Sequence, residues 1–536
     1  MTTHHPHNLD FNEQFTRAYD LMERSRRNIF LTGRAGTGKS TLLQYFRGRT
    51  RKNVAVLAPT GVAAVNVKGQ TIHSFFNFKP DITPEGVRSV RIGKAKKNMY
   101  QKLETVVIDE VSMVRADLLD CVDAFLRVHG PQKGSAFGGV QMILIGDLYQ
   151  LPPVVGPAER AVFGGKAGGN GGAMYRSPYF FDAKVIEHLG TEPVELEKIY
   201  RQKDGDFIGL LNAVRNNSVT EQHLEALNKR FIPGFKPPDN DFYIHLTTTN
   251  ALADQINRER LGALKGKTHH YEGTLNGDFD AKSLPTQEEL DLKTGSQVML
   301  LNNDRAGRWI NGTLGKIVDV QEDSDGADVI HVELAEGGGT VEVTPFTWEM
   351  FRFFYNEDAD RLDSETIGSF TQYPLRLAWA ITIHKSQGKT FCKVIVDIGG
   401  GTFSHGQVYV ALSRCTSLEG IVLKKPILKK HIFMDWRIVQ FMTGWQYRRA
   451  EADLPLDEKK RILEQAIENE KAVEIVYLKA SDEKTRRTIG PRVVGEMEYQ
   501  GKTYLGVEAY CFERKDIRVF RVDRILEIRE SACAER

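Results

Sequence analysis

A short run of glycines with one lysine and one serine carries the clearest chemical signal in the sequence. The run from Gly33 to Ser40 reads GRAGTGKS, with an apolar strand, Ile29 to Leu31, before it and the helical residues LLQYF after it. The glycines let backbone N–H groups turn inward around a polyphosphate, and the helix that follows adds its positive end. In that arrangement Lys39 neutralises the outer phosphates and the Ser40 hydroxyl ligates Mg²⁺.

Two further strands end in polar residues that suit the same chemistry. The strand Leu103 to Ile108 ends in Asp109 and Glu110, which places one carboxylate on the metal and the next beside an attacking water as general base. Such a pair is a weak signal alone, but it lies about 70 residues after the phosphate loop, where it becomes a strong one. Gln150 follows the strand that ends at Ile145, and its neutral amide suits a sensor of the terminal phosphate or a turn that caps the strand.

The segment after the strand Val54 to Ala58 mixes small residues with aromatic and hydroxyl groups. His73 and Phe75 lie in it, just past the end of a parallel strand, where such groups stack bases and hold the phosphates of a single strand. A core aromatic pair with a helix cap is an equally good interpretation. The basic run 78–102 that follows is either a solvated face or an insertion that touches a duplex.

Composition limits the class of protein. The 536 residues, with 41% hydrophobic and 26% charged residues, predict two to four soluble globular domains. A formal charge of +2 predicts no polyanion partner, so a nucleic acid would need a local basic track. Five scattered cysteines without a Cys-x-x-Cys pair favour a reducing compartment and argue against zinc. We find no membrane span or signal core, so a cytoplasmic protein is expected.

The order of motifs predicts four parts. Strands that end in polar loops and alternate with helices indicate doubly wound α/β domains at 1–190, with the phosphate loop, and at 191–293 with 369–446, without one. Short alternating strands at 294–368 predict a small inserted β-barrel. A separate β module is expected at 455–536, after a polar connection from Arg448 to Pro455, and the glycine-rich run Gly164 to Ala173 predicts a flexible loop.

A series of ordered motifs gives the chain a family resemblance. GRAGTGKST, APTGVAA with TIHSFF, VIDEVSMV, GDLYQLPPV, LEKIYRQ, TTTNALADQIN, TIHKSQGKT and YVALSRCTS resemble the superfamily 1 helicases of the Pif (petite integration frequency) type, which are related to RecD, over about residues 10 to 440. The C-terminal module resembles the WYL domain, an Sm-like barrel, with Thr503 at the position of the Trp in that name. The fold implied is a tandem of RecA-like P-loop domains with an inserted SH3-like β-barrel and a C-terminal Sm-like barrel.

The resemblance implies an ATP-driven motor that moves 5′ to 3′ on single-stranded DNA and unwinds duplexes, forks or G-quadruplexes in replication, recombination or repair. It implies ATP and Mg²⁺ as cofactors, single-stranded DNA and junctions with duplex as partners, a monomeric motor, and the bacterial cytoplasm or nucleoid as location.

The resemblance also assigns roles residue by residue. Gln14 meets adenine, Asp109 supports magnesium with Ser40, Glu110 activates water, Gln150 senses the γ-phosphate, and Arg201 and Arg414 are arginine fingers. The other nucleotide contacts are Gly36, Thr37, Gly38, Lys39, Ser40, Thr41 and Gly388. The strand contacts are Thr60, His73, Phe75, Thr248, Asn250, His384 and Lys385. In the C-terminal module we expect Tyr510, Arg514, Arg518 and Arg521 to bind a single strand or to regulate the motor, or else to pack across strands with the arginines paired to Glu513 and Asp523.

Two other functions fit parts of this pattern. A sensor in which the WYL module does the work and ATP only sets the conformation is disfavoured by Arg201 and Arg414, because a passive nucleotide switch needs no second lobe. The sequence does not distinguish a DNA helicase well from a translocase or RNA motor that does not unwind DNA. The reason is that strand contacts in such motors are mostly to phosphates and stacked bases.

Overall fold

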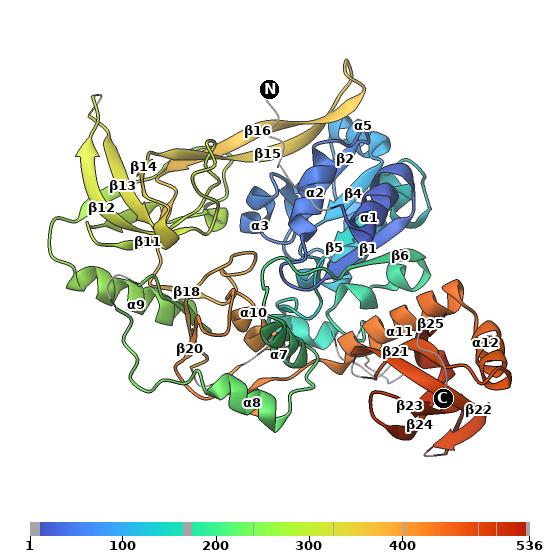
Figure 1. The fold of residues 1–536 in the computed structure, drawn as a ribbon. Helices are drawn as coiled ribbons and strands as arrows, with labels where there is room; N and C mark the ends of the chain where they lie inside the picture. The colour runs from blue at the N-terminus through green and yellow to red at the C-terminus, as the bar shows by residue number, and fades with distance from the viewer. Residues whose placement is uncertain are drawn as a thin grey trace. The chain divides into compact units, whose positions relative to one another are not determined.

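The structure is a computed structural model that describes residues 11–163, 174–238, 241–324, 326–399, 401–402, 404–480, 482–499 and 501–531. Over these residues the chain divides into two compact units, one of residues up to 211 with 220–432 and one of residues 212–219 with 433 onward (Figure 1). The predicted loop from Gly164 to Ala173 and the cysteine Cys533 lie outside the described residues. No helix within the described ranges is both long and apolar enough to cross a membrane.

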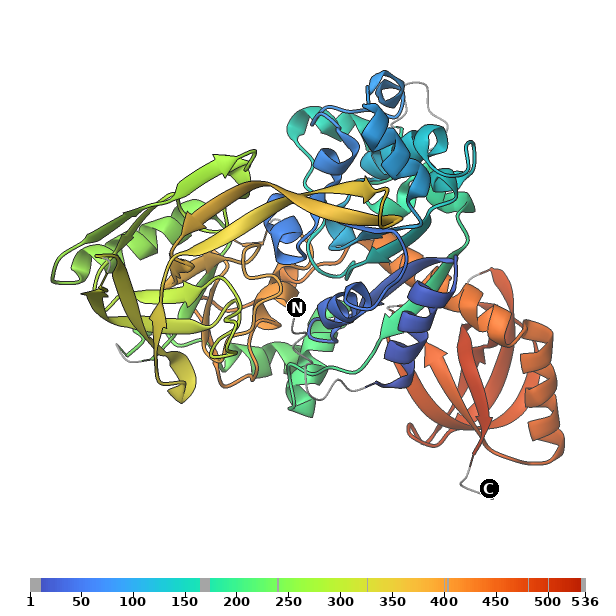
Figure 2. The same cartoon turned by 90° about the horizontal axis from the view of Figure 1, so that it is seen from above.

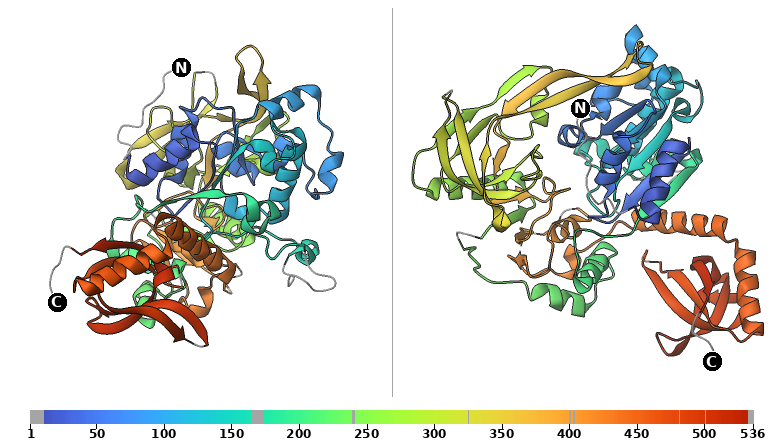
Figure 3. Two further views of the ribbon diagram at one scale, coloured as in Figure 1. Left: turned by 90° about the vertical axis from the view of Figure 1, so that its right-hand side faces the viewer. Right: turned by 45° about the horizontal axis from the view of Figure 1, so that its top comes forward.

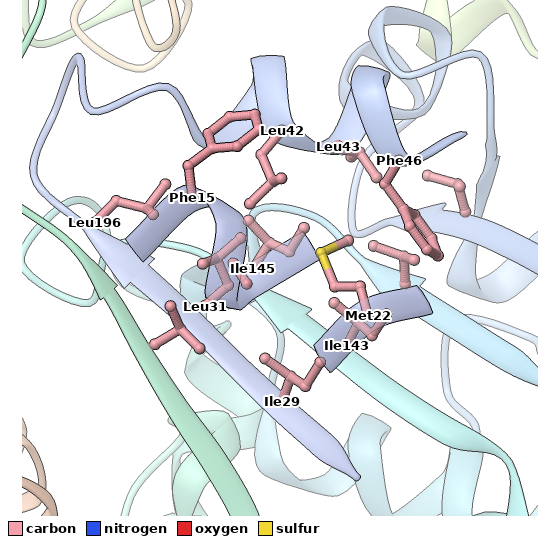
Figure 4. Close-up of a cluster of buried hydrophobic side chains, with 14 residues drawn as sticks. Phe15, Met22, Ile29, Leu31, Leu42, Leu43, Phe46, Ile143, Ile145 and Leu196 are labelled. Carbon is pink, nitrogen blue, oxygen red and sulfur yellow. The ribbon is translucent and has the colours of Figure 1, made fainter. Parts of the chain in front are cut away.

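The first unit begins with a parallel sheet of strand order β3-β2-β4-β5-β1-β6. Its strands are β1 (Asn28–Gly33), β2 (Val54–Ala58), β3 (Gln70–Thr71), β4 (Thr105–Ile108), β5 (Gln141–Ile145) and β6 (Thr191–Leu196). The helices of this part are α1 (Glu13–Arg24), α2 (Lys39–Arg47), α3 (Gly61–Asn66), α4 (Ile72–Phe76), α5 (Lys94–Lys102) and α6 (Ala116–His129). The apolar faces of α1 and α2 pack against β1 and β5 in one buried core, which includes Phe15, Leu42 and Ile143 (Figure 4). This packing fixes the loop between β1 and α2.

The first lobe is longer than expected. β6 pairs in parallel with β1 along its whole length, so the sheet extends to Leu196 and the expected boundary at residue 190 is wrong. The strand was hard to predict because it contains Pro193, which is unusual in strands. In addition, its first three residues are all half-buried, and half-buried and buried residues alternate only from Val194 to Leu196.

A second parallel sheet has the strand order β18-β7-β19-β20. Its strands are β7 (Ile244–Thr247), β18 (Ala380–Thr382), β19 (Val394–Asp397) and β20 (Ile421–Leu423). The helices of this part are α7 (Gly205–Arg215), α8 (Glu221–Asn228), α9 (Asn250–Ala263) and α10 (Gln407–Leu412). Both sheets place the carboxyl ends of neighbouring strands together, which is where ligands bind in such folds.

Antiparallel strands occupy the region between β7 and β18, and they extend beyond the predicted limits of 294 and 368. They are β8 (His269–Glu272), β9 (Thr274–Gly277), β10 (Glu289–Leu292), β11 (Gln297–Leu300), β12 (Leu314–Glu322), β13 (Asp328–Leu334), β14 (Thr340–Val343), β15 (Phe346–Asn356), β16 (Arg361–Gln372) and β17 (Leu375–Leu377). β17 belongs to the sheet β14-β13-β12-β11-β17, and Leu290 of β10 shares its core. The insert therefore spans about His269 to Leu377, and its long β15–β16 hairpin was not predicted (Figure 2).

The second unit combines helices α11 (Trp436–Asp453) and α12 (Leu456–Glu468) with an antiparallel sheet of order β24-β23-β22-β21-β25. The strands are β21 (Val473–Leu478), β22 (Lys484–Tyr499), β23 (Lys502–Cys511), β24 (Asp516–Arg521) and β25 (Ile525–Glu530). Helix α12 lies against this sheet (Figure 3), and its Leu463 belongs to the hydrophobic core between them. The predicted connection from Arg448 to Pro455 is largely the last turns of α11, because RRAEAD consists mostly of good helix formers.

Candidate nucleotide-hydrolysis site

The phosphate loop lies between β1 and α2 and has the backbone that the glycines predict. Gly36 and Gly38 have φ angles of +80° and +88°, in the left-handed region that glycine adopts without a steric cost. The Lys39 ammonium donates to the carbonyl oxygens of Gly33 at 2.6 Å and Arg34 at 3.0 Å. Lys39 is thus held at the loop that it is expected to serve.

The chain that leaves β6 covers this loop. The Tyr200 N–H donates to the Gly36 carbonyl at 2.9 Å. A Cβ atom at Gly36 would lie 2.6 Å from the Cβ atom of Arg201, so only glycine allows the two backbones to approach this closely. The segment that carries one predicted arginine finger is therefore packed directly on the phosphate loop.

Carboxylates gather where β4 and β5 end. The Glu110 N–H donates to Asp109 Oδ1 at 2.9 Å, and the Gln150 amide donates to Asp147 Oδ2 at 3.2 Å. Burial raises the pKa of Glu110 to about 7, and the neighbouring charge of Asp109 raises it further. Lys39 and Arg414 oppose this shift, so cations of both halves lie within electrostatic range of Glu110. A carboxyl group with a pKa near 7 suits a general base at neutral pH.

Both predicted fingers lie at the junction of the two halves. The Arg201 guanidinium donates to the Ser413 carbonyl at 3.0 Å and to the Gly388 carbonyl at 3.4 Å. Arg414 is 1% exposed and donates from Nε to the Val410 carbonyl at 2.9 Å. Burial lowers the pKa of Arg414 to about 9, with the cationic Arg201 adding to the effect.

The site has the ligands that adenine and magnesium require. Gln14, near the start of α1, donates to Glu197 at 3.4 Å, so its amide lies beside the chain that covers the phosphate loop. The hydroxyl of Ser40 and the carboxylate of Asp109 are the hard oxygen donors that Mg²⁺ prefers when phosphates and water complete its shell. No cluster of three or more His, Cys, Asp or Glu side chains that could hold a metal occurs among the described residues. Ser40 and Asp109 therefore fit a magnesium ion that a bound nucleotide brings with it.

Several predicted strand contacts lie at the carboxyl ends of β2, β7 and β18. Thr60 caps α3, accepting from the Ala63 N–H at 3.3 Å. β18 and β7 are in register at Thr382 and Thr247, which brings Thr248 and Asn250 to the same edge as His384 and Lys385. Lys385 is exposed and His384 is half-buried, and burial lowers the pKa of both.

Phe75 does not have the exposure that base stacking requires. Its ring is 1% exposed and packs edge-on against Phe76, Tyr100 and Phe353. The interpretation as a core aromatic pair is therefore the one that holds for Phe75, and its assignment to the strand contacts is corrected. His73 is half-buried, and burial together with the nearby Arg115 lowers its pKa.

Parts of the insert contact both halves close to residues predicted to bind a strand. A side chain at Gly61, next to Thr60, would collide with Ser283. Asn311 donates to Asn66 of α3 at 3.4 Å and accepts from the Lys389 ammonium at 2.7 Å. The β11–β12 loop thus contacts the first lobe and the second lobe at one residue.

The residues predicted in the C-terminal module differ in their surroundings. Tyr510 is half-buried and its ring lies edge-on to Phe512 at 5.3 Å, while Arg514 and Arg518 are exposed. Arg521 donates to Asp523 at 2.6 Å, which is the arginine–carboxylate pair that the sequence offers as the alternative to strand binding. Arg521 therefore has the paired arrangement, and its part in binding a strand stays a prediction.

Two residues of the site were not predicted. Asp147 is 1% exposed and raises the pKa of Glu110, and it could have been found as a carboxylate just past a buried strand. Tyr409 lies five residues before Arg414 and reaches the phosphate loop, where its hydroxyl accepts from the Ala35 N–H at 3.2 Å. Nothing in a single tyrosine on a buried helix predicts that contact.

These features define a P-loop nucleoside triphosphatase whose hydrolytic groups come from two RecA-like halves. The family model described as PIF1-like helicase matches residues 11–223, and the WYL domain model matches residues 458–530. The ATP-dependent DNA helicase Pif1 of Bdellovibrio bacteriovorus is 33% identical over 78% of this chain and 88% of its own. The human ATP-dependent DNA helicase PIF1 is 34% identical over 74% of this chain and 58% of its own.

Solved structures agree with this assignment. Unliganded Pif1 from Bacteroides sp. has a TM-score of 0.73 at 36% identity, over 82% of this chain and 98% of its own. The same protein bound to single-stranded DNA has a TM-score of 0.58 at 36% identity, over the same shares of the two chains. The chain belongs to the PIF1-like helicase family and is an ATP-hydrolysing helicase with a C-terminal WYL domain.

The raised pKa of Glu110 predicts a pH dependence. The carboxylate accepts a proton only when it is ionised, so kcat/KM for ATP should rise with pH through about 7. Between pH 6 and 8 the rise should be about tenfold, because the ionised fraction of such a group grows by that factor. The measurement is steady-state ATPase with excess Mg²⁺, and Glu110→Gln should remove the activity. A rate that is flat from pH 6 to 8 would contradict this role.

The burial of Phe75 predicts a change in stability without a loss of strand binding. Phe75→Ala should lower the free energy of unfolding by about 3 to 5 kcal/mol, as for other large-to-small core substitutions. Phe75→Leu should cost less and leave the affinity for a fluorescent single strand within about twofold. A tenfold loss of affinity for the single strand in the stable Phe75→Leu variant would show that Phe75 does take part in strand binding.

Proposed function

We propose that this chain moves 5′ to 3′ along single-stranded DNA and unwinds duplex, forked or G-quadruplex DNA at the expense of ATP. The observation that carries the proposal is the division of the hydrolytic site. The phosphate loop and Glu110 lie in the first lobe, whereas Arg414 comes from the second. A solved structure of Bacteroides Pif1 is bound to single-stranded DNA, and another solved structure concerns the unwinding of forked duplex DNA by two coordinating Pif1 helicases, which supports the choice of substrate.

In this proposal the first lobe holds the nucleotide. Gln14 contacts adenine, and the loop amides from Gly36 to Thr41 hold the phosphates with Lys39. Ser40 and Asp109 hold magnesium, which supplies charge neutralisation at the phosphates. Glu110 takes a proton from the attacking water, and Gln150 contacts the terminal phosphate.

The second lobe completes the site. Arg201 and Arg414 stabilise the charge that develops on the transferred phosphoryl group, and such an arginine typically contributes about 10³ to 10⁵ in rate. Burial lowers the pKa of both arginines, and a polyanion beside them offsets that cost. Hydrolysis removes the phosphate that both lobes contact, so the lobes separate again.

Alternate gripping of the strand turns this cycle into movement. The first lobe holds the strand at Thr60 and His73, and the second at Thr248, Asn250, His384 and Lys385. Each lobe releases when the other closes, and melting one base pair costs only about 1.4 kcal/mol in stacking on average. We further propose that the insert around β11 to β14 is SH3-like, that the WYL sheet is Sm-like, that the motor acts as a monomer, and that it works in the bacterial cytoplasm or nucleoid.

Other activities predict different results. An RNA motor would show ATPase stimulated equally by RNA and DNA strands. A ligand sensor would hydrolyse ATP slowly whatever strand is added, which disagrees with Arg414 within electrostatic range of Glu110 and with Arg201 packed on the phosphate loop.

The polarity is tested with partial duplexes that carry either a 5′ or a 3′ single-stranded tail. We expect unwinding of the 5′-tailed substrate, because the chain belongs to this helicase family, and little unwinding of the 3′-tailed one. Strand separation is followed by fluorescence with ATP and Mg²⁺. Lys39→Ala is the blank, since it removes the charge that holds the outer phosphates. Equal unwinding of both substrates would exclude the proposed polarity.

A buried polar cluster supports regulation of the motor by the WYL module. α7 begins three residues after Gln202 and passes from the first unit into the second. Just after its end, Asn216 donates to the Asp482 carbonyl at 3.3 Å, and Gln446 of α11 donates to Asp482 Oδ1 at 2.9 Å. Asn216, Gln446 and Asp482 are 6%, 7% and 7% exposed. One helix therefore connects the segment of Arg201 with the β21–β22 turn of the WYL module.

We propose that a single strand bound at Tyr510, Arg514 and Arg518 changes the position of this turn and thereby the ATPase rate. Asn216→Ala removes the donor to Asp482, so the ratio of strand-stimulated to basal ATPase should change by about threefold or more, as expected for one buried hydrogen bond. Asn469→Ala is the matched control, because that exposed amide contacts only its own helix at Gln465. Equal ratios in both variants and the unchanged chain would exclude the coupling.

A further inference from the structure

One side chain of the second half is inserted into the phosphate loop. Tyr409 lies in α10, is 4% exposed, and accepts a hydrogen bond from the Ala35 N–H at 3.2 Å. Ala35 and Tyr409 are 374 positions apart in the chain, so the contact depends on the closed arrangement of the two halves. A backbone N–H of a phosphate loop is a group that would otherwise serve an anion.

The position of Ala35 in the loop tells which phosphate its N–H faces. The Lys39 ammonium donates to the carbonyls of Gly33 and Arg34, the two residues that precede Ala35. The lysine of such a loop reaches the β- and γ-phosphates. The Ala35 N–H therefore lies at the end of the loop that holds the outer phosphates.

The charges around Tyr409 point to the same end. Its phenol lies close enough to both Arg201 and Arg414 to raise their pKa values against the effect of burial. Glu110 and Asp147 act on Arg414 in the same way. The hydroxyl of Tyr409 thus lies among the groups that would surround a terminal phosphate.

Close packing holds α10 in this place. Gly406 precedes the helix with a φ of +75°, and a side chain there would collide with the carbonyl oxygens of Tyr149 and Gln150. The helix that carries Tyr409 is therefore fixed against the segment that carries the predicted phosphate sensor. A shift of Gln150 on nucleotide binding would be transmitted to Tyr409.

We propose that the Tyr409 hydroxyl occupies the place of a γ-phosphate oxygen in the empty loop and that a triphosphate must displace it. This inference rests on the proposed ATP site and adds how that site distinguishes ATP from ADP. ADP has no γ-phosphate, so it does not compete with Tyr409 for the Ala35 N–H. ATP takes over the Ala35 N–H, and the released tyrosine frees α10 to bring Arg414 to the phosphate.

The test is the substitution Tyr409→Phe, which keeps the ring and removes only the hydroxyl. A non-hydrolysable ATP analogue should bind about fivefold more tightly, because it no longer competes with an internal hydrogen bond of ordinary strength. ADP affinity should stay within about twofold. Affinities are measured by equilibrium titration of the full chain without DNA, with thermal unfolding to confirm the fold. Tyr45→Phe is the matched control, since its ring packs beside Phe15 on the outer side of α2.

Three results would overturn the proposal. Weaker binding of the analogue would mean that the hydroxyl contacts the bound triphosphate. Equal tightening for ADP would remove the discrimination, and unchanged affinities for both would leave Tyr409 as a packing residue. Lys39→Ala tests the proposed ATP site separately from the role of Tyr409. If this variant still binds the ATP analogue and ADP with normal affinity, the proposed ATP site is wrong, whatever the result for Tyr409→Phe.

Discussion

The close approach of two backbones at Gly36 is the constraint on which the rest of the site depends. Glycine at this position leaves room for the Cβ atom of Arg201, and the Tyr200 N–H closes the contact on the Gly36 carbonyl. β6 is the last strand of the first sheet. The chain that follows it carries Arg201, whose guanidinium donates to the Ser413 carbonyl of the second half. Because this segment contacts both the nucleotide loop and the second half, a movement of one is passed on to the other through it.

Electrostatics explain why this arrangement needs a ligand. Arg201 and Arg414 are both buried cations, burial lowers the pKa of each, and the charge of Arg201 lowers the pKa of Arg414 further. Their hydrogen bonds are to neutral oxygens, among them the carbonyls of Ser413 and Val410. Glu110 and Asp147 offset part of the charge from the first half. A polyphosphate offsets the remainder, so its binding and the closure of the halves favour each other.

The chemistry of the loop could be predicted from the sequence, whereas the partition of the chain could not. The glycines of GRAGTGKS predict the backbone of the loop, and Asp109 and Glu110 directly follow an apolar run that predicts a buried strand. β6 was not predicted because Pro193 is unusual in a strand, and the length of the insert was underestimated because β8 and β9 are short and lie far from β17 in the chain. Phe75 shows the limit of composition: an aromatic residue at a strand end has the same type and spacing whether it packs in a core or stacks on a base. Tyr409 shows the limit of motifs, because its contact with Ala35 exists only in the folded chain.

The helix α7 contributes residues to both units of the chain. Residues 212–219 belong to the second unit although they lie in the middle of the helicase sequence, and Arg215 among them is only 2% exposed. A chain cut after α11 would leave that arginine and Asn216 without the surroundings that bury them. Exchange of this module between proteins would therefore require matching changes some 270 positions earlier, at the partner of Asp482. In this respect the motor and the module must evolve as one unit rather than as two interchangeable parts.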